Sequence, residues 1–196
     1  MKKEEKLNDP EMREILFETY ENTGARLRIF EELVIGKSRA DAIMVTEDEI
    51  LGFEIKSDKD SLARLVTQVK NYERFCDKCY IVTGVHYIDR IEDAVPNHWG
   101  IYDIAKDENG KLHIEMFREA SRNPKERPTT KLKNQMSLLW RSELSSVVKS
   151  NKLGGVTTRN KRELRELIIE KMGKETAKKI TCELLLERDY SVYREN

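Results

Sequence analysis

Hydrophobic residues near the start of the chain first follow helical spacing and then strand-like spacing. Residues 11–21 repeat apolar side chains near i, i+3 and i+4, which predicts an amphipathic helix. Three short apolar runs follow at residues 32–35, 39–45 and 50–57, and the connections between them are tight. The pattern predicts three antiparallel strands in a meander.

The next stretch alternates the two kinds of spacing. Residues 62–75 have helical periodicity, preceded by several N-cap candidates within Ser57–Ser61. Tyr80 to Thr83 form a continuous apolar run typical of a buried strand. The remaining predicted elements are a short helix at 87–94 and two strands at 99–105 and 111–117, which flank the hairpin signal Asn109-Gly110.

The last third of the chain reads as helical. A polar linker at residues 118–130 contains two prolines, and helices are predicted at 131–149, 161–172 and 175–188. The fold class predicted is therefore α/β, with an α-βββ-α-β core around a mixed sheet and a helical carboxy-terminal region.

Charge is distributed unevenly although the net charge is zero. Residues 1–117 hold 17 Lys and Arg against 25 Asp and Glu, whereas residues 118–196 hold 19 against 11. This division favours a basic segment that meets a polyanion, attached to an acidic body that could bind metal. The alternative is chance variation of charge on solvated faces.

Composition also bears on the compartment. Three cysteines argue against a disulfide framework, and the charged start of the sequence lacks the apolar region of a secretory signal. No apolar run approaches the roughly 20 residues that a membrane span needs. We therefore expect a cytoplasmic protein without a membrane partner.

Candidate chemistry is concentrated on two of the predicted strands. Alternation along a strand places Glu54 and Lys56 on one face, and a fold-back can bring Asp41 beside Glu54. Two carboxylates that meet in this way suit a hard cation, Mg²⁺ or Mn²⁺, with the backbone carbonyl of Ile55 as a further ligand. The alternative is an ordinary same-face charge pair on a surface strand.

Lys56 would complement such a cation. Its ammonium group could position or help deprotonate a metal-bound water, or neutralise charge on a phosphate. Carboxylates alone would repel an anionic phosphodiester, and a metal ion together with a lysine reverses that sign. The residues thus indicate metal-assisted chemistry on a phosphate ester.

The pattern Asp41…Glu54-Ile55-Lys56 on a hairpin within α-βββ-α-β resembles the PD-(D/E)XK nuclease superfamily, in particular a little-characterised phage and bacterial branch. Ala40 stands where that superfamily usually has proline. The resemblance implies a restriction-endonuclease-like core over residues 1–120 and a Mg²⁺-dependent deoxyribonuclease with little sequence specificity. A catalytically inactive nucleic-acid-binding or assembly module of the same fold is the alternative.

The resemblance adds supporting residues. Relatives often carry an acidic residue before the first strand that helps to hold metal, which points to Glu32, although Glu31 is not separated from it. Gln68 lies where a glutamine often closes over the site. Arg39 could bind phosphate or could pair with an acid such as Glu32.

The basic region at 121–196 is expected to grip DNA. Its predicted helix, extended loop and second helix are similar to the small SAP-type DNA-binding motif, with Arg159, Lys161 and Arg162 as the binding residues. Helices that merely cover the sheet are an equal alternative, and a homodimer is left open. Cys76 and Cys79 have CxxC spacing, but no second cysteine pair exists, so a zinc site is not expected.

Overall fold

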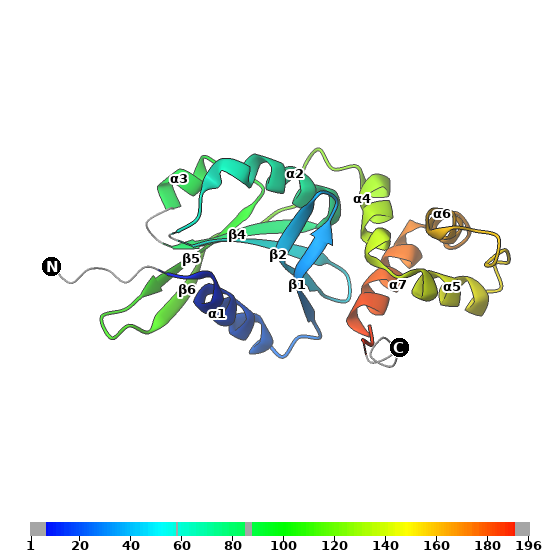
Figure 1. Cartoon of the computed structure of the whole chain (residues 1–196), viewed down its shortest axis with the longest axis horizontal. Coiled ribbons are helices and arrows are strands. Elements are labelled where there is room, and N and C mark those ends of the chain that lie inside the picture. The colour runs from blue at the N-terminus through cyan, green and yellow to red at the C-terminus, as the bar shows by residue number, and fades with distance from the viewer. Residues whose placement is uncertain (1–6, 58, 85–87, 191–196) are drawn as a thin grey trace.

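Six strands form one mixed sheet in the part of the chain that a computed structural model describes, residues 7–57, 59–84 and 88–190. The strands lie side by side in chain order, and only the pairs β3–β4 and β4–β5 are parallel (Figure 1). The mixed sheet and the opening meander are therefore as predicted. The strands are β1 (Arg28–Ile35), β2 (Ser38–Val45), β3 (Ile50–Lys56), β4 (Lys78–Gly84), β5 (Gly100–Lys106) and β6 (Leu112–Arg118).

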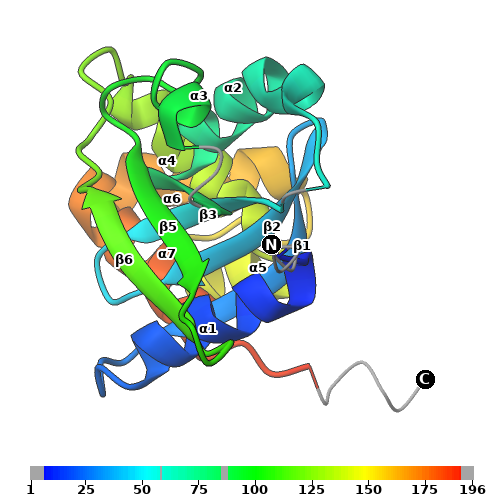
Figure 2. The same cartoon turned by 90° about the vertical axis from the view of Figure 1, so that its left-hand side faces the viewer.

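Helices cover both faces of this sheet. Helix α1 (Asp9–Glu21) lies against one face, and α2 (Leu65–Phe75) and α3 (Ile88–Glu92) lie against the other (Figures 1 and 2). A short 3₁₀ turn, η1 (Leu62–Arg64), leads into α2 and is capped by the side chain of Ser61. Asp58, another cap candidate, and Tyr87, the predicted start of the short helix, lie outside the described residues.

Alternation along the strands divides the apolar residues between two cores. Met44, Leu51 and Phe53 belong to the cluster that packs with α1, whereas Ile43 and Ile50 belong to the cluster that packs with α2. Both clusters are almost completely shielded from solvent. Glu54 and Lys56 share the parity of Ile50, so they project toward α2.

The carboxy-terminal helices pack beside the sheet and extend the α2-side core. They are α4 (Pro128–Gln135), the 3₁₀ turn η3 (Met136–Leu138), α5 (Arg141–Ser150), α6 (Lys161–Met172) and α7 (Lys174–Leu186). Their apolar residues belong to the same buried cluster as α2 and the strands. One hydrophobic core runs across the boundary between residues 120 and 121. The division into a core at 1–120 and a region at 121–196 stays a prediction.

A buried aspartate ties these helices to the sheet. Asp77 accepts hydrogen bonds from the Ile50 amide at 2.8 Å, from Gln135 of α4 at 3.1 Å and from Lys178 of α7 at 2.5 Å. Burial alone would raise the pKa of Asp77, but the charge of Lys178 and these hydrogen bonds outweigh burial and lower it. Asp77 is therefore held as an anion between sheet and helices.

The prediction of one helix over residues 131–149 is wrong. The chain is extended at Leu139 and Trp140, and α5 begins only at Arg141. Arg188 enters this break, donates to the Leu138 carbonyl at 2.9 Å and pairs with Glu143 of α5 at 2.8 Å. In a continuous helix the Leu138 carbonyl would accept a hydrogen bond from within the helix. At the break it accepts one from the buried Arg188 guanidinium instead.

Candidate functional site

The β2–β3 register brings Asp41 to Glu54. Ala42 pairs with Phe53, so Asp41 and Glu54 occupy the next position along the two strands. The strands no longer pair there, and the Ile55 amide instead donates to Asp41 Oδ2 at 2.8 Å. The fold-back expected from the sequence is present, and it places the two carboxylates on one face.

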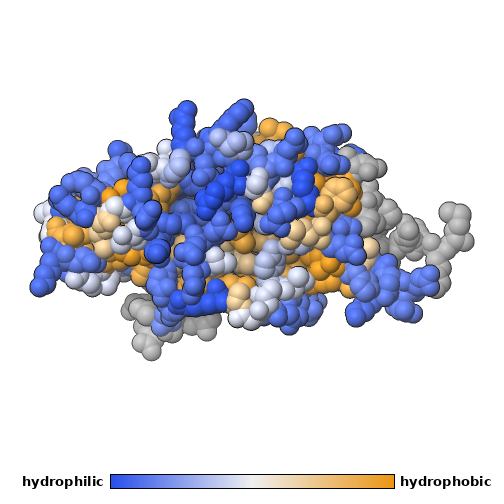
Figure 3. Space-filling model, turned by 180° about the vertical axis from the view of Figure 1, so that it is seen from behind, coloured by the Kyte–Doolittle hydropathy of each residue, from blue (hydrophilic) through white to orange (hydrophobic). Residues whose placement is uncertain are grey.

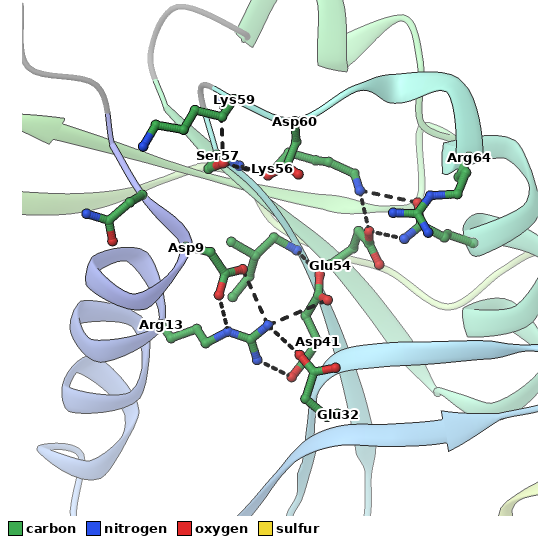
Figure 4. A pocket seen from close by; sticks show the side chains of 13 residues that line it. Asp9, Arg13, Glu32, Asp41, Glu54, Lys56, Ser57, Lys59, Asp60 and Arg64 are labelled. Atoms are coloured by element: carbon green, nitrogen blue, oxygen red, sulfur yellow. Dashed lines mark hydrogen bonds and ion pairs between the residues drawn. The ribbon is translucent and has the colours of Figure 1, made fainter.

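Lys56, which lies beside Glu54 in Figure 4, and Gln68 complete a polar cluster around Glu54. Lys56 Nζ lies 2.6 Å from Glu54 Oε1 and 3.2 Å from Gln68 Oε1. Gln68, on α2, also donates through Nε2 to Glu54 Oε1. The Glu54 side chain is 0% exposed and that of Lys56 is 7% exposed, so water screens their charges little.

One oxygen of Glu54 is left without a partner. Glu54 Oε2 is buried and accepts no hydrogen bond from any described residue. The nearby Tyr72 hydroxyl helps to lower the pKa of Glu54, but its hydrogen bond goes to the Phe53 carbonyl at 2.8 Å, and it accepts from the Asp41 amide at 2.9 Å. An orphaned buried carboxylate oxygen is costly and requires a physical explanation.

Burial raises the pKa of both acids. The pKa of Glu54 rises from its ordinary 4.5 to about 7, chiefly because the carboxylate is desolvated and next because Asp41 lies beside it. Burial also raises the pKa of Asp41, although the hydrogen bond from Ile55 and the charge of Arg13 oppose the rise. The pair therefore carries less than its full negative charge near neutral pH unless a cation joins it.

The raised pKa of Glu54 predicts a pH-dependent stability. The folded state binds this proton more tightly than the unfolded chain, so the contribution is complete below about pH 4.5 and is lost as the pH rises through 7. The loss should be on the order of 3 kcal/mol, because each pKa unit corresponds to about 1.4 kcal/mol. Urea unfolding in EDTA between pH 5 and 8 should show this decline in wild type and not in Glu54→Gln. Glu31→Gln, which removes an exposed carboxylate, serves as the control, and equal slopes in wild type and Glu54→Gln would contradict the prediction.

Arg13 is a central residue of the site that the sequence did not reveal. Its guanidinium, only 13% exposed, donates to the Asp41 carbonyl at 2.7 Å and to Glu32 Oε1 at 2.8 Å. It also pairs with Asp9 at 2.5 Å and lies 3.6 Å from Asp41 Oδ1. The spacing of Asp9 and Arg13, four residues apart on a helix, was the available signal, but it indicates only a local ion pair.

Glu32 lies beside the carboxylate pair rather than within it. Its φ of 54° is unusual for a residue other than glycine and turns the side chain from the regular strand direction. Oε1 pairs with Arg13 and Oε2 pairs with Arg39 at 2.6 Å, so both oxygens are on guanidinium groups. Glu32 rather than Glu31 lines the cavity, and its role as a metal ligand stays a prediction.

These residues line an open cavity of about 430 Å³. Two cations that the sequence did not single out, Lys59 and Arg64, also line it, and no described residue forms an ion pair with either. Of the predicted site, the structure brings together Asp41, Glu54, Lys56, Gln68 and Glu32, with the Ile55 backbone beside them. Arg39 is 69% exposed and pairs with Glu32, the second of its two predicted alternatives.

The three basic residues predicted to bind DNA lie in the helical region, where α5, an irregular segment and α6 follow one another. Lys161 donates to the Ser137 carbonyl at 2.8 Å, and Arg162 pairs with Glu166 at 3.2 Å. Arg159 donates to the Gly154 carbonyl at 3.1 Å. Binding of DNA by the three stays a prediction, and all three already have intramolecular partners.

A family model described as Bacteriophage P4 protein cII matches residues 2–194. The chain belongs to this family. The assignment to the PD-(D/E)XK superfamily is therefore wrong, and with it the deoxyribonuclease function and the alternative of an inactive module of that superfamily. The motif was misleading because it shows only that the side chains of Asp41, Glu54 and Lys56 share one face of a strand pair. The same arrangement can occur in unrelated families. The expected link to phages is retained.

Other comparisons add little to membership of the Bacteriophage P4 protein cII family. No curated protein matches the sequence. One solved structure, the SPO1766 protein of unknown function from Silicibacter pomeroyi, matches with 22% identity and a TM-score of 0.39. The match covers 54% of this chain and 66% of that protein, just under two thirds of its length.

Neither a membrane-spanning helix nor a cluster of metal ligands is found among the described residues. None of the helices there is both long enough and apolar enough to cross a membrane. No three His, Cys, Asp or Glu side chains among them gather into a group that could hold a metal ion. Cys76, Cys79 and Cys182 are free and buried, and burial raises the pKa of the Cys79 thiol.

Proposed function

We propose that Asp41 and Glu54 hold a divalent cation, Mg²⁺ or Mn²⁺, and that this centre binds a phosphate group of an anionic ligand. The observation that carries the proposal is the buried Glu54 Oε2, which accepts no hydrogen bond from the described residues. A cation would satisfy this oxygen and would offset the burial and the repulsion from Asp41 that together raise the pKa of Glu54. A hard ion is favoured because the available donors are oxygens.

The donor set fits Mg²⁺ rather than a metal held entirely by protein. Asp41 and Glu54 provide two carboxylates, and the Ile55 carbonyl is the predicted third ligand. Mg²⁺ commonly takes one or two carboxylates and keeps water or ligand phosphate in its other positions. Among the described residues no three acidic, histidine or cysteine side chains gather into one metal-holding group, which is compatible with that preference.

Beside its carboxylates, which include Asp9 and Asp60, the cavity holds cations that an anionic ligand could contact. Lys56, Lys59 and Arg64 line the same cavity, and the last two have no carboxylate partner in the described part of the chain. A bound divalent ion supplies positive charge that stabilises phosphate oxygens. Lys56 would hold one such oxygen, while Gln68 keeps Lys56 and Glu54 in place.

DNA, the partner expected from the charge distribution, carries phosphates of this kind. Activity as a Mg²⁺-dependent enzyme on ester bonds stays a prediction, as does a cytoplasmic location. We also propose that the α-βββ-α-β order corresponds to a restriction-endonuclease-like core. This proposal concerns architecture alone and is separate from membership of the Bacteriophage P4 protein cII family.

Calorimetric titration of the full chain with Mn²⁺ and with Mg²⁺ at pH 7.5 tests the cation site. We expect one site in wild type and binding weakened at least about tenfold in Glu54→Gln and Asp41→Asn, since each loses a charged ligand. Glu115→Gln, an exposed acid on β6, is the matched control and should bind as wild type does. Equal affinity in wild type and Glu54→Gln would refute the proposal. Glu32→Gln, measured in parallel, tests whether Glu32 is a ligand.

A further inference from the structure

A second cavity lies in the helical region, between α5 and the segment 154–158. It measures about 400 Å³ and is lined by Arg141, Ser145, Ser146, Lys149 and Thr157 among others. Figure 1 places α5 and α6 at the end of the molecule away from α3 and the β5–β6 hairpin. None of its lining residues belongs to the cavity around Asp41 and Glu54.

Positive charge around this groove is not neutralised. Residues 141–162 contain six Lys and Arg and one acidic residue, Glu143. Glu143 pairs with the buried Arg188, so it is not available to the groove. Within the described part of the chain, Arg141, Lys149 and Arg159 form no ion pair with a carboxylate, whereas the exposed Arg162 does.

Two of these cations are held in place by backbone carbonyls. Arg141 Nη2 donates to the carbonyls of Val156 at 3.1 Å and Arg159 at 3.0 Å. Arg159 packs against Gly155, whose φ is +69° and where a Cβ would lie 1.4 Å from the guanidinium. A carbonyl orients a guanidinium without cancelling its charge, so both groups are preorganised with N–H donors to spare.

Hydroxyl groups accompany the charges. The Ser145 hydroxyl lines the groove, is buried and has no hydrogen-bond partner among the described residues. Ser146 and Thr157 add exposed hydroxyls. Arginine, lysine and hydroxyl side chains are the groups that contact phosphate oxygens of a nucleic-acid backbone.

The surroundings favour nucleic acid over a membrane. The large hydrophobic side chains exposed in the described residues are Val34, Val66, Met116, Phe117 and Tyr190, and none lies on α5 or α6. Insertion into a lipid surface needs such anchors beside the basic residues. Figure 3, a view of one face, shows hydrophilic residues over most of the surface and hydrophobic groups only between them.

We propose that this groove binds the phosphodiester backbone of nucleic acid and does so without a divalent cation. The inference shares with the proposed function the expectation of a phosphate ligand, but it involves other residues. It overlaps the sequence prediction at Arg159, which lies beside the groove, and adds Arg141 and Lys149, which line it. Arg162 pairs instead with Glu166.

The test measures fluorescence anisotropy of a labelled 20-base-pair DNA duplex with the full chain in EDTA, over a range of salt concentrations. Lys149→Glu should weaken binding at least fivefold and make the slope of log K against log salt shallower by about 1 or more, because each lost phosphate contact removes about 0.9. Lys111→Glu, the same charge change on the distant β5–β6 connection, should stay within twofold of wild type. Lys149→Gln provides a milder variant if the charge reversal disturbs α5.

Several outcomes would overturn the inference. These are the absence of duplex binding in EDTA, equal weakening by Lys149→Glu and Lys111→Glu, and binding of anionic vesicles or an acidic peptide in preference to DNA. The two proposals fail separately. A wild type that binds the duplex in EDTA but binds no Mn²⁺ or Mg²⁺ would refute only the proposed function, and a wild type that binds the cation but not the duplex in EDTA would refute only this inference.

Discussion

Replacing Lys56 with methionine should destabilise the protein by roughly 3 kcal/mol at pH 8, since removal of one partner from a buried ion pair leaves the other charge uncompensated. Lys56 Nζ is 2.6 Å from Glu54 Oε1, and both side chains are almost wholly buried. Because the pKa of Glu54 is already about 7, the carboxylate can take up a proton instead. The cost should therefore shrink markedly at pH 5.5, and urea unfolding at the two pH values measures it.

The double variant Glu54→Gln/Lys56→Met separates charge from packing. It removes both charges and keeps similar volumes, so it should be more stable at pH 8 than Lys56→Met alone. If the double variant loses as much stability as the two single variants lose together, the pair contributes through packing rather than through charge. A loss from Lys56→Met that is the same at pH 5.5 and pH 8 would likewise contradict the prediction.

The spacing of hydrophobic residues and the residue types at turns predicted much of the architecture. Alternation along β3 identified Glu54 and Lys56 as facing away from Phe53 and Ile55, and the packing confirms this. The helix after η1 and the Asn109-Gly110 connection also lie where the pattern placed them. These features are local, because a few neighbouring residues determine the spacing and the turn.

Contacts between residues distant in sequence were beyond such reasoning. Arg13 reaches Asp41 from another element, and nothing in the helical spacing of α1 indicates that contact. The break at Leu139 depends on Arg188, some fifty positions later. Both depend on how elements pack, which periodicity does not determine.

The family was mispredicted for a related reason. The motif consists of groups suited to binding a cation and a phosphate, namely those of Asp41, Glu54 and Lys56. Such groups are common to many folds and families. The match over residues 2–194 depends instead on the sequence of nearly the whole chain. A motif of three residues can therefore indicate a site while failing to identify the family that carries it.

Arg13→Met is expected to have opposite effects on stability and on cation binding. Without the guanidinium, the carboxylates of Asp9, Glu32 and Asp41 lose their shared counter-charge, which should cost about 2 kcal/mol in EDTA after allowance for screening by solvent. The matched control is Arg39→Met, since Arg39 pairs with Glu32 but is 69% exposed. Its effect should be clearly smaller in the same urea unfolding experiment.

Cation affinity should move the other way. Arg13 lies 3.6 Å from Asp41 Oδ1 and lowers the negative potential that a divalent ion would experience. Its removal should tighten Mn²⁺ binding by about tenfold, equivalent to about 1.4 kcal/mol, and added Mn²⁺ should recover part of the lost stability. Weaker Mn²⁺ binding in Arg13→Met would instead mean that the hydrogen bond from Arg13 to the Asp41 carbonyl is needed to hold that carboxylate in position. Calorimetric titration of the two variants beside wild type thus decides whether Arg13 competes with the cation or prepares its site.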